Sequence, residues 1–202
     1  MVSSRFDTLA IDIASKFAVN LPSIHSGLGK TLLRLGTSSH NELFFNQVVS
    51  KILPDLIRPD GELAGVYLRG VLCFQGYASG LDFFNRCSSE NSHYRIILPD
   101  FLFGLYENQF YIECIDYYNT LCERLHWRHV HSIYPGTETA YYHRQKGIKV
   151  LQHSRVYSAV IGSALALEDV ELADQLLAEM RFWDIQPLRE TYYDYLNVSE
   201  NE

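Results

Sequence analysis

The chain has 202 residues, of which 47% are hydrophobic, and it carries a formal net charge of −7 at neutral pH. A chain of this size and composition can bury a substantial core, so an intrinsically disordered protein is excluded. The negative total argues against nonspecific binding to nucleic acid, which requires clustered lysine and arginine, and no DNA partner is expected. No apolar run approaches the roughly 18 residues that a membrane-spanning helix needs.

Residues 1–60 predict N-terminal helices joined by a loop. A weak helical pattern covers residues 9–17, where acidic residues accompany the basic ones and no clear organelle presequence is present. A stronger apolar stripe over residues 45–56 follows a possible capping box made by Ser39 and Glu42. The glycine-rich stretch between these two patterns is expected to be the loop.

This stretch contains "SGLGKT", from Ser26 to Thr31, which ends like a phosphate-binding loop. Such a loop needs the pattern GxxxxGK[ST], because its first glycine turns the chain away from a strand and the following amides then wrap the phosphate. Ile24 stands where that first glycine belongs, and no apolar strand precedes it. The sequence therefore predicts a loop that enters the helix of "KTLLRL", without a bound nucleotide.

The rest of the chain, residues 61–202, contains pairs of amphipathic helical patterns separated by short turns. The first pair covers residues 63–87, the second covers residues 98–125, and both have apolar side chains at spacings of three and four. The clearest pair lies between Tyr157 and Pro187. Each helix of a pair needs a neighbour to cover its apolar face, so the pairs are expected to be helical hairpins.

The second helices of these three pairs align at small residues, Gly80, Cys114 and Ala173, which lie 34 and then 59 residues apart. Steps of this size indicate a helical-repeat array with one insertion, at about residues 127–150. The expected fold is therefore all-α, an α-solenoid of stacked hairpins over residues 61–202.

The clearest pair also carries particular letters of a known repeat. Tyr157 is an aromatic residue near the start of the first helix, Ala173 is a small residue in the second, and "LLAEM" and "IQP" close the unit at Met180 and Pro187. On these letters Ser154–Leu188 resembles a pentatricopeptide repeat. The resemblance implies an array that binds single-stranded RNA in an organelle. The two upstream pairs fit tetratricopeptide-like or generic helical repeats nearly as well.

The resemblance also implies roles for single positions. The family reads bases with the residue after the aromatic, here Ser158, and with the last residue of the repeat, here Leu188. Leucine cannot discriminate bases by hydrogen bonding. Glu168 and Asp184 stand where the family usually has glycine in a left-handed turn, which costs about 1 kcal/mol each if that backbone is kept.

The charge reverses sign locally around the predicted insertion. Between Arg124 and Arg155, six basic residues face a single acid, Glu138, and aromatic residues are interleaved with them. Basic side chains hold phosphates and aromatic rings stack bases in single-stranded RNA sites. The candidate RNA-binding residues are Arg124, Trp127, Arg128, Arg144, Lys146, Lys149 and Arg155, with Ser158 added by the resemblance. The alternative is a solvated loop whose aromatic rings pack on the array.

Two other residue patterns point to no chemistry. "HWRHVH", residues 126–131, has spacing that two or three zinc ligands could use, but no cysteine or suitable carboxylate completes the set apart from Glu123. The four cysteines lie inside helical patterns without CxxC spacing, which is typical of reduced packing residues. No catalytic residue, metal or cofactor is therefore expected, and the chain is not predicted to be an enzyme.

Two functional hypotheses remain. The first is a noncatalytic repeat protein of mitochondrial gene expression that binds RNA or docks to an RNA–protein assembly such as the mitochondrial ribosome; its function and location are implied by the resemblance. The second is a protein–protein scaffold without RNA contact. The acidic total, the unusual base-reading positions and the many tyrosine and phenylalanine residues favour the second, because aromatic residues often anchor interfaces.

Overall fold

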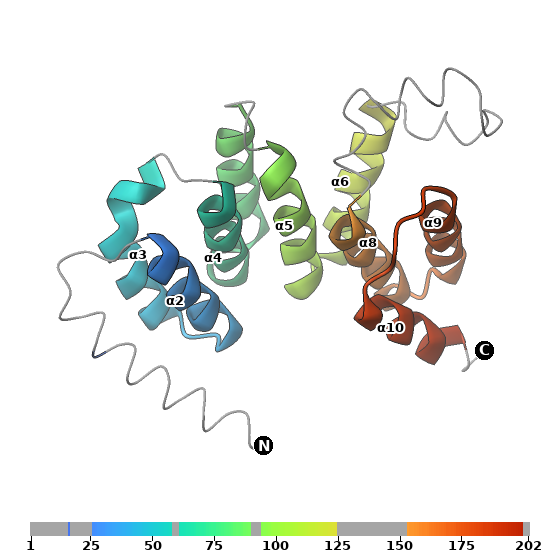
Figure 1. Ribbon diagram of the computed structural model, residues 1–202, viewed down its shortest axis with the longest axis horizontal. Helices are drawn as coiled ribbons and strands as arrows, with labels where there is room; N and C mark the ends of the chain where they lie inside the picture. Colours follow the sequence, from blue (N-terminus) through green and yellow to red (C-terminus); the bar gives the residue numbers. More distant parts are fainter. Residues whose placement is uncertain (1–15, 17–25, 58–60, 90–93, 125–152, 200–202) are drawn as a thin grey trace. The chain divides into compact units, whose positions relative to one another are not determined.

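The structure is a computed structural model that describes residues 16, 26–57, 61–89, 94–124 and 153–199. The described residues form helices joined by short turns, without a strand among them (Figure 1). The all-α prediction is confirmed. The weak helical pattern before residue 17, apart from the helical residue 16, and the predicted insertion lie outside the described residues.

The chain forms two compact units, residues 1–101 and 102–202. The first contains α2 (Ser26–Ser38), α3 (Glu42–Ile57) and α4 (Gly61–Ser89). The second contains α6 (Tyr111–Arg124), α8 (Ser154–Ala166), α9 (Val170–Phe182) and α10 (Arg189–Ser199). The boundary falls inside α5 (Tyr94–Glu107).

The first unit has its core where α2 meets α3 and α4. Three buried side chains, Leu33, Phe45 and Ile52, are at most 1% exposed. The cluster also includes Leu32, Phe44, Val48, Leu63 and Val66. The helix predicted over "KTLLRL" is confirmed as part of α2, but the loop predicted before it is wrong from Ser26 onward, because α2 already begins there.

The start of α3 also differs from the prediction. Asn41, and not Ser39, caps this helix, because its Oδ1 accepts a hydrogen bond from the Phe44 amide at 3.0 Å. The Ser39 hydroxyl instead donates to the Leu35 carbonyl of α2 at 2.6 Å. Ser39 thus belongs to the end of one helix and Asn41 to the start of the next.

The long element α4 is folded back on itself at Gly76. This glycine has φ 81° and ψ −177°, which no helix contains. The rings of Tyr67 and Phe83 are 4.9 Å apart between centroids, whereas positions so far apart along a straight helix would be separated by about 24 Å. The hairpin predicted over residues 63–87 is confirmed.

The second unit is built around α8, which packs on α6, α9 and α10. Its buried face includes Val156, Tyr157, Val160, Ile161 and Ala164, all fully covered. The predicted hairpin of residues 157–187 is confirmed as α8 and α9. Ahead of α8, α5 and α6 are separated by three residues, and the Cys114 thiol lies 3.6 Å from the Leu102 carbonyl oxygen.

Four helices end with the same backbone turn, in which one residue other than glycine has a positive φ. These residues are His40 (φ 50°), Gln109 (φ 64°), Glu168 (φ 60°) and Asp184 (φ 55°). In each turn the amide of the following residue donates to the carbonyl five positions back, as Asp169 does to Ala164 at 2.9 Å. This is the Schellman motif. The left-handed turns expected at Glu168 and Asp184 are confirmed.

In three of these turns the next residue also starts the following helix. Asn41, Phe110 and Asp169 each accept, through their carbonyl oxygens, from the amide four residues later. Two of those amides belong to Cys114 and Ala173. Cys114 and Ala173 therefore lie at the same distance along the chain from their turns, whereas Gly80, which the sequence aligned with them, follows the different turn at Gly76.

Close packing of helices depends on glycine at particular positions. A Cβ atom at Gly70 in α4 would overlap the ring of Phe45 in α3, and one at Gly162 in α8 would overlap the ring of Tyr106 in α5. Gly70 therefore lets α3 and α4 approach until the Phe45 ring lies against the α4 backbone.

Replacing Gly70 by alanine tests this packing. The new methyl group overlaps the Phe45 ring, so we expect the free energy of unfolding to fall by about 1 to 3 kcal/mol, although alanine is ordinarily the better helix former. Urea denaturation followed by circular dichroism measures the change. Replacing Phe45 by leucine in the same chain makes room for the methyl group, so the double variant should lose less than the two single losses combined. Additive losses would contradict this contact.

A glutamine-to-glycine exchange tests the turns, with opposite results expected at two positions. Gln109→Gly should raise the free energy of unfolding by about 1 kcal/mol, because glycine adopts a positive φ without steric cost. Gln175→Gly, on the exposed side of α9, should lower it by about 1 kcal/mol, because glycine weakens a helix interior. Urea denaturation measures both. A loss of stability at both positions would show that Gln109 is not in the left-handed region.

Candidate functional site

The structure places the side chains of only two of the eight candidate RNA-binding residues. Trp127, Arg128, Arg144, Lys146 and Lys149 lie outside the described residues. Arg124 is the last residue of α6, and its side chain is likewise not described. Arg155 and Ser158 both lie in the first half of α8. The described residues therefore do not test whether the basic and aromatic residues predicted from the sequence lie close together.

Both placed side chains make contacts inside the second unit. The Arg155 guanidinium carbon lies 4.8 Å from the centroid of the Phe103 ring, which is a cation–π contact. Ser158 is 4% exposed, and its hydroxyl donates to the Ser154 carbonyl at 2.8 Å. The hydroxyl that the family resemblance assigns to base reading is therefore engaged within its own helix. Leu188, the other base-reading position, is half-buried.

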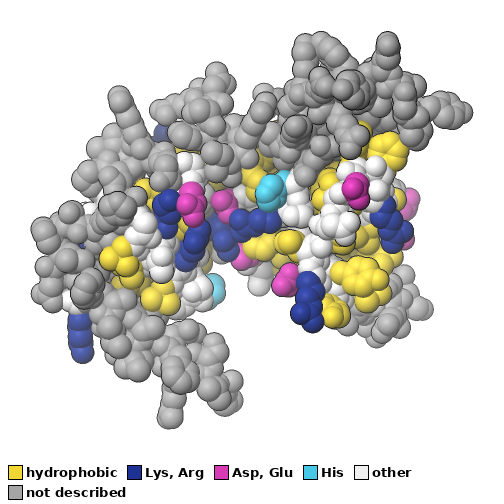
Figure 2. All heavy atoms as spheres, viewed as in Figure 1, with side chains coloured by type: hydrophobic (Ala, Val, Ile, Leu, Met, Phe, Trp, Pro, Cys, Tyr) yellow, Lys and Arg dark blue, Asp and Glu magenta, His cyan; other side chains and the backbone are white. Residues whose placement is uncertain are grey.

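Among the described residues of the second unit, the large exposed aromatic side chains lie on α9 and α10. Phe182, Tyr192 and Tyr193 are 45%, 49% and 51% exposed. Figure 2 shows apolar side chains reaching the surface here, beside charged ones. The Arg189 guanidinium lies over the Tyr193 ring at 5.4 Å from its centroid. The sequence showed that aromatic residues are abundant, but it did not indicate that Phe182, Tyr192 and Tyr193 are exposed. Each of them lies within or next to an apolar run, where helical periodicity alone does not show which rings are covered by a neighbouring helix.

A second feature of the same surface is a cavity of about 340 Å³. Its walls come from the end of α9, the turn after it and the first half of α10. Most of the lining is apolar: Leu177, Met180, Ile185, Pro187 and Tyr192, with the charged Arg181 and Asp184 beside them. A cavity of this size and lining can accept a large apolar side chain.

The first unit has a groove of about 390 Å³ between the two arms of α4. Tyr67 and Phe83 form its aromatic wall, and Gln75 and Ser79 contribute polar groups. Arg86, which also lines the groove, pairs with Asp82 at 3.1 Å. Because this ion pair is exposed to solvent, it adds little stability.

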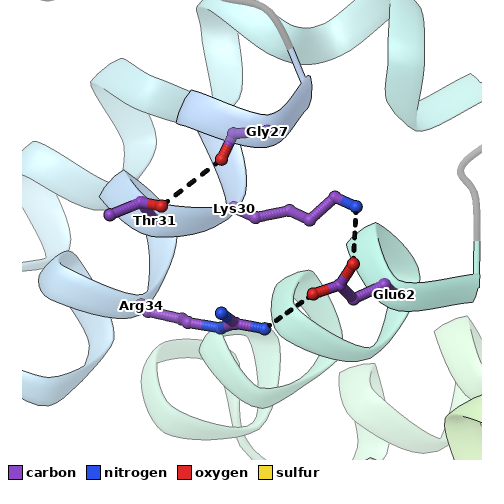
Figure 3. A network of polar contacts seen from close by, with 5 residues as sticks. All are labelled: Gly27, Lys30, Thr31, Arg34 and Glu62. Atoms are coloured by element: carbon purple, nitrogen blue, oxygen red, sulfur yellow. Dashed lines mark hydrogen bonds and ion pairs between the residues drawn. The ribbon is translucent and has the colours of Figure 1, made fainter.

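The "SGLGKT" segment is a helical turn and not a loop (Figure 3). Lys30 donates to one oxygen of Glu62 at 2.8 Å, and Arg34 donates to the other at 3.1 Å. The Thr31 hydroxyl donates to the Gly27 carbonyl at 3.3 Å. The hydrogen bond from Lys30 is the main cause that lowers the pKa of Glu62. Of the two residues that a phosphate-binding loop would use, Lys30 therefore binds α4 through Glu62, and Thr31 forms a hydrogen bond within α2.

A polar cluster that sequence reasoning missed lies inside the second unit. The hydroxyls of Tyr118 in α6 and Tyr157 in α8 both lie within reach of Oε2 of Glu179 in α9, at 3.4 and 3.3 Å. Tyr118 is 2% exposed and Tyr157 is fully buried. A buried tyrosine needs a hydrogen-bond partner for its hydroxyl. Tyrosine at two apolar helix positions could therefore have indicated a buried polar cluster, but the sequence does not show that Glu179 is the acceptor.

Burial keeps these groups protonated. It is the main cause that raises the pKa of both tyrosine hydroxyls, and the negative charge of Glu179 adds to the rise. Burial also raises the pKa of the nearby Cys114 thiol to about 12. A thiol that stays protonated at neutral pH is a poor nucleophile. Cys114 and Cys122 are buried reduced thiols, as expected of packing cysteines.

Comparison of the chain with protein-family models, curated proteins and solved structures found no match. Within the described ranges, no three histidine, cysteine or acidic side chains come together to hold a metal ion. Residues 126–131, with the histidine cluster, lie outside those ranges. Each helix among the described residues is too short or too polar to cross a membrane. Function must therefore be inferred from the chain's own residues.

The tyrosine cluster predicts how stability depends on pH. An unfolded tyrosine ionises near pH 10, and both buried tyrosines have a higher pKa when folded. Their contribution is therefore complete below about pH 10 and is lost as the pH rises further, by about 1.4 kcal/mol per pH unit for each group. Urea denaturation between pH 9 and 11 should show this fall.

The variant with both Tyr118→Phe and Tyr157→Phe is the control for this effect. Above pH 10 the free energy of unfolding of this variant should fall less steeply with pH. The folded and unfolded states of the variant should differ by up to about two fewer bound protons than those of the unchanged protein. Cys114 adds a smaller fall that both proteins share, because its pKa is also raised. Ionisation of Tyr118 and Tyr157 near pH 10 in the folded protein, detected by tyrosinate absorbance, would contradict their burial.

Proposed function

We propose that the chain is a noncatalytic helical-repeat protein of the pentatricopeptide kind that works in mitochondrial gene expression. It binds single-stranded RNA or docks to an RNA–protein assembly such as the mitochondrial ribosome. The observation that carries this proposal is the recurrence of one turn geometry, at Asn41, Phe110 and Asp169, each opening the second helix of a hairpin.

Packing within each unit supports a repeat array. In the first unit α2 packs on its partner α3 and also on α4, and in the second unit α8 packs on its partner α9 and also on α10. A first helix that contacts both its own second helix and the next first helix is the arrangement that stacked hairpins need. The turns at Phe110 and Asp169 are 59 residues apart, which accommodates one repeat and the predicted insertion.

The RNA contact is assigned to the basic segment between Arg124 and Arg155. Its six basic residues provide charge for phosphates, and Trp127 and the tyrosines of the segment provide rings for bases.

A protein–protein scaffold without RNA contact is the second candidate, and the state of two residues favours it. The Ser158 hydroxyl is engaged within α8, and the Arg155 guanidinium lies on an aromatic ring of its own unit. The Ser158 hydroxyl is therefore not presented for RNA in this conformation. With Leu188 at the other base-reading position, sequence-specific reading by this repeat lacks a hydrogen-bonding group on both sides.

Titration with single-stranded RNA at several salt concentrations separates the two candidates. If the basic segment binds phosphates, the affinity falls steeply with salt, and changing Arg144, Lys146 and Lys149 to glutamate weakens binding by tenfold or more. The slope of log affinity against log salt should also decrease by about 2, since each lost phosphate contact contributes about 0.7 for single strands.

The control variant carries the same change of charge elsewhere. Lys51, Arg181 and Arg189 are replaced by glutamate, and this variant should keep the salt dependence of the unchanged protein. Equal losses in both variants would show that only total charge matters. Absence of binding even at low salt would leave the scaffold as the function.

A further inference from the structure

The acidic charge of the chain is concentrated on the turns and helices at the end of the second unit. Residues 168–194 contain eight acidic residues and two arginines, a net charge of −6. The whole chain has a net charge of −7. Most of these acids are exposed: Glu168, Asp169, Glu171, Asp174, Asp184, Glu190 and Asp194. A nucleic acid or an anionic membrane surface is repelled by such a segment.

The same segment exposes apolar groups of a kind that interfaces use. Phe182 ends the outward side of α9, which also carries Glu171, Asp174 and Gln175. Tyr192 and Tyr193 lie on α10, and Tyr192 forms one wall of the cavity of about 340 Å³. Exposed aromatic rings beside an apolar cavity are typical of the anchor positions of protein interfaces.

We propose that this α9–α10 surface binds a lysine- and arginine-rich protein segment, and that a large apolar side chain of that segment enters the cavity. Charge complementarity selects the partner, because the acids around the aromatic rings attract a basic chain. These exposed charges by themselves slow the dissociation of that chain only a little. The cavity supplies the contact that holds it, because its lining is mainly apolar.

This proposal goes beyond the proposed function and is independent of RNA binding. The RNA contact is assigned to residues 124–155, whereas the protein contact uses residues 168–194. A chain that binds no RNA can still bind a basic partner here. Loss of one activity in a variant therefore does not decide the other.

The test uses the full chain and two fluorescent probe peptides of equal length and lysine content. One is an amphipathic lysine–leucine helix, and the other replaces each leucine by serine. Fluorescence anisotropy should show that the lysine–leucine peptide binds at least about tenfold more tightly. Binding should also weaken with salt, because exposed charges are screened. Equal affinity for the two peptides would overturn the role of the cavity.

Two variants locate the binding. Tyr192→Ser removes a wall of the cavity and should weaken binding of the lysine–leucine peptide by about tenfold. Replacing Glu190 and Asp194 by lysine, on one exposed side of α10, should weaken it by at least as much and flatten its salt dependence. These side chains are exposed, so circular dichroism should show an unchanged fold.

The matched control reverses the same number of charges on another surface of the second unit. Asp116 and Glu123 are exposed on α6, and their replacement by lysine should leave the affinity within about twofold, apart from the small effect of total charge. An equal loss in this control, or undiminished binding in the Tyr192→Ser variant, would overturn the proposal.

Discussion

The tight turns of this protein depend on one residue held in the left-handed backbone region at the end of a helix. Such a residue lets two amides return to the last free carbonyls and reverses the chain within three residues. At His40, Gln109, Glu168 and Asp184 the residue is not glycine, which costs about 1 kcal/mol each. At His40 and Glu168 the turn is nevertheless kept, because the helices that it joins, α2 with α3 and α8 with α9, pack on each other and fix its geometry.

The turn also determines which side chains can meet. Since the residue after the left-handed one caps the next helix in three cases, the first turn of that helix always starts at the same distance from the preceding helix. Cys114 and Ala173 therefore come to equivalent local positions, both fully buried. Glu179, further along the same helix as Ala173, reaches two buried tyrosines on other helices. Its carboxylate in α9 thus contacts side chains of both α6 and α8.

The consequence for function is a separation of charge along the chain. Packing occupies α8 on most sides, and it engages Ser158 and Arg155 inside the second unit. The groups for which partners are proposed are the basic residues between Arg124 and Arg155 and the acidic, aromatic surface of α9 and α10. Because the two carry opposite charge, a different kind of partner is proposed for each.

The sequence by itself determined most of the helices and the hairpins of residues 63–87 and 157–187. These features follow from local periodicity and from residues close together in the chain, so neighbouring letters suffice to predict them. Only the tertiary structure decided that the helix predicted over "KTLLRL" already begins at Ser26, because Gly29 packs against Ile52 of α3 despite the low helix propensity of glycine. The same holds for the buried hydroxyl of Ser158 and for Glu179, whose partner Tyr118 is 61 residues away. Contacts of that range depend on how the helices pack, and no local pattern contains that information.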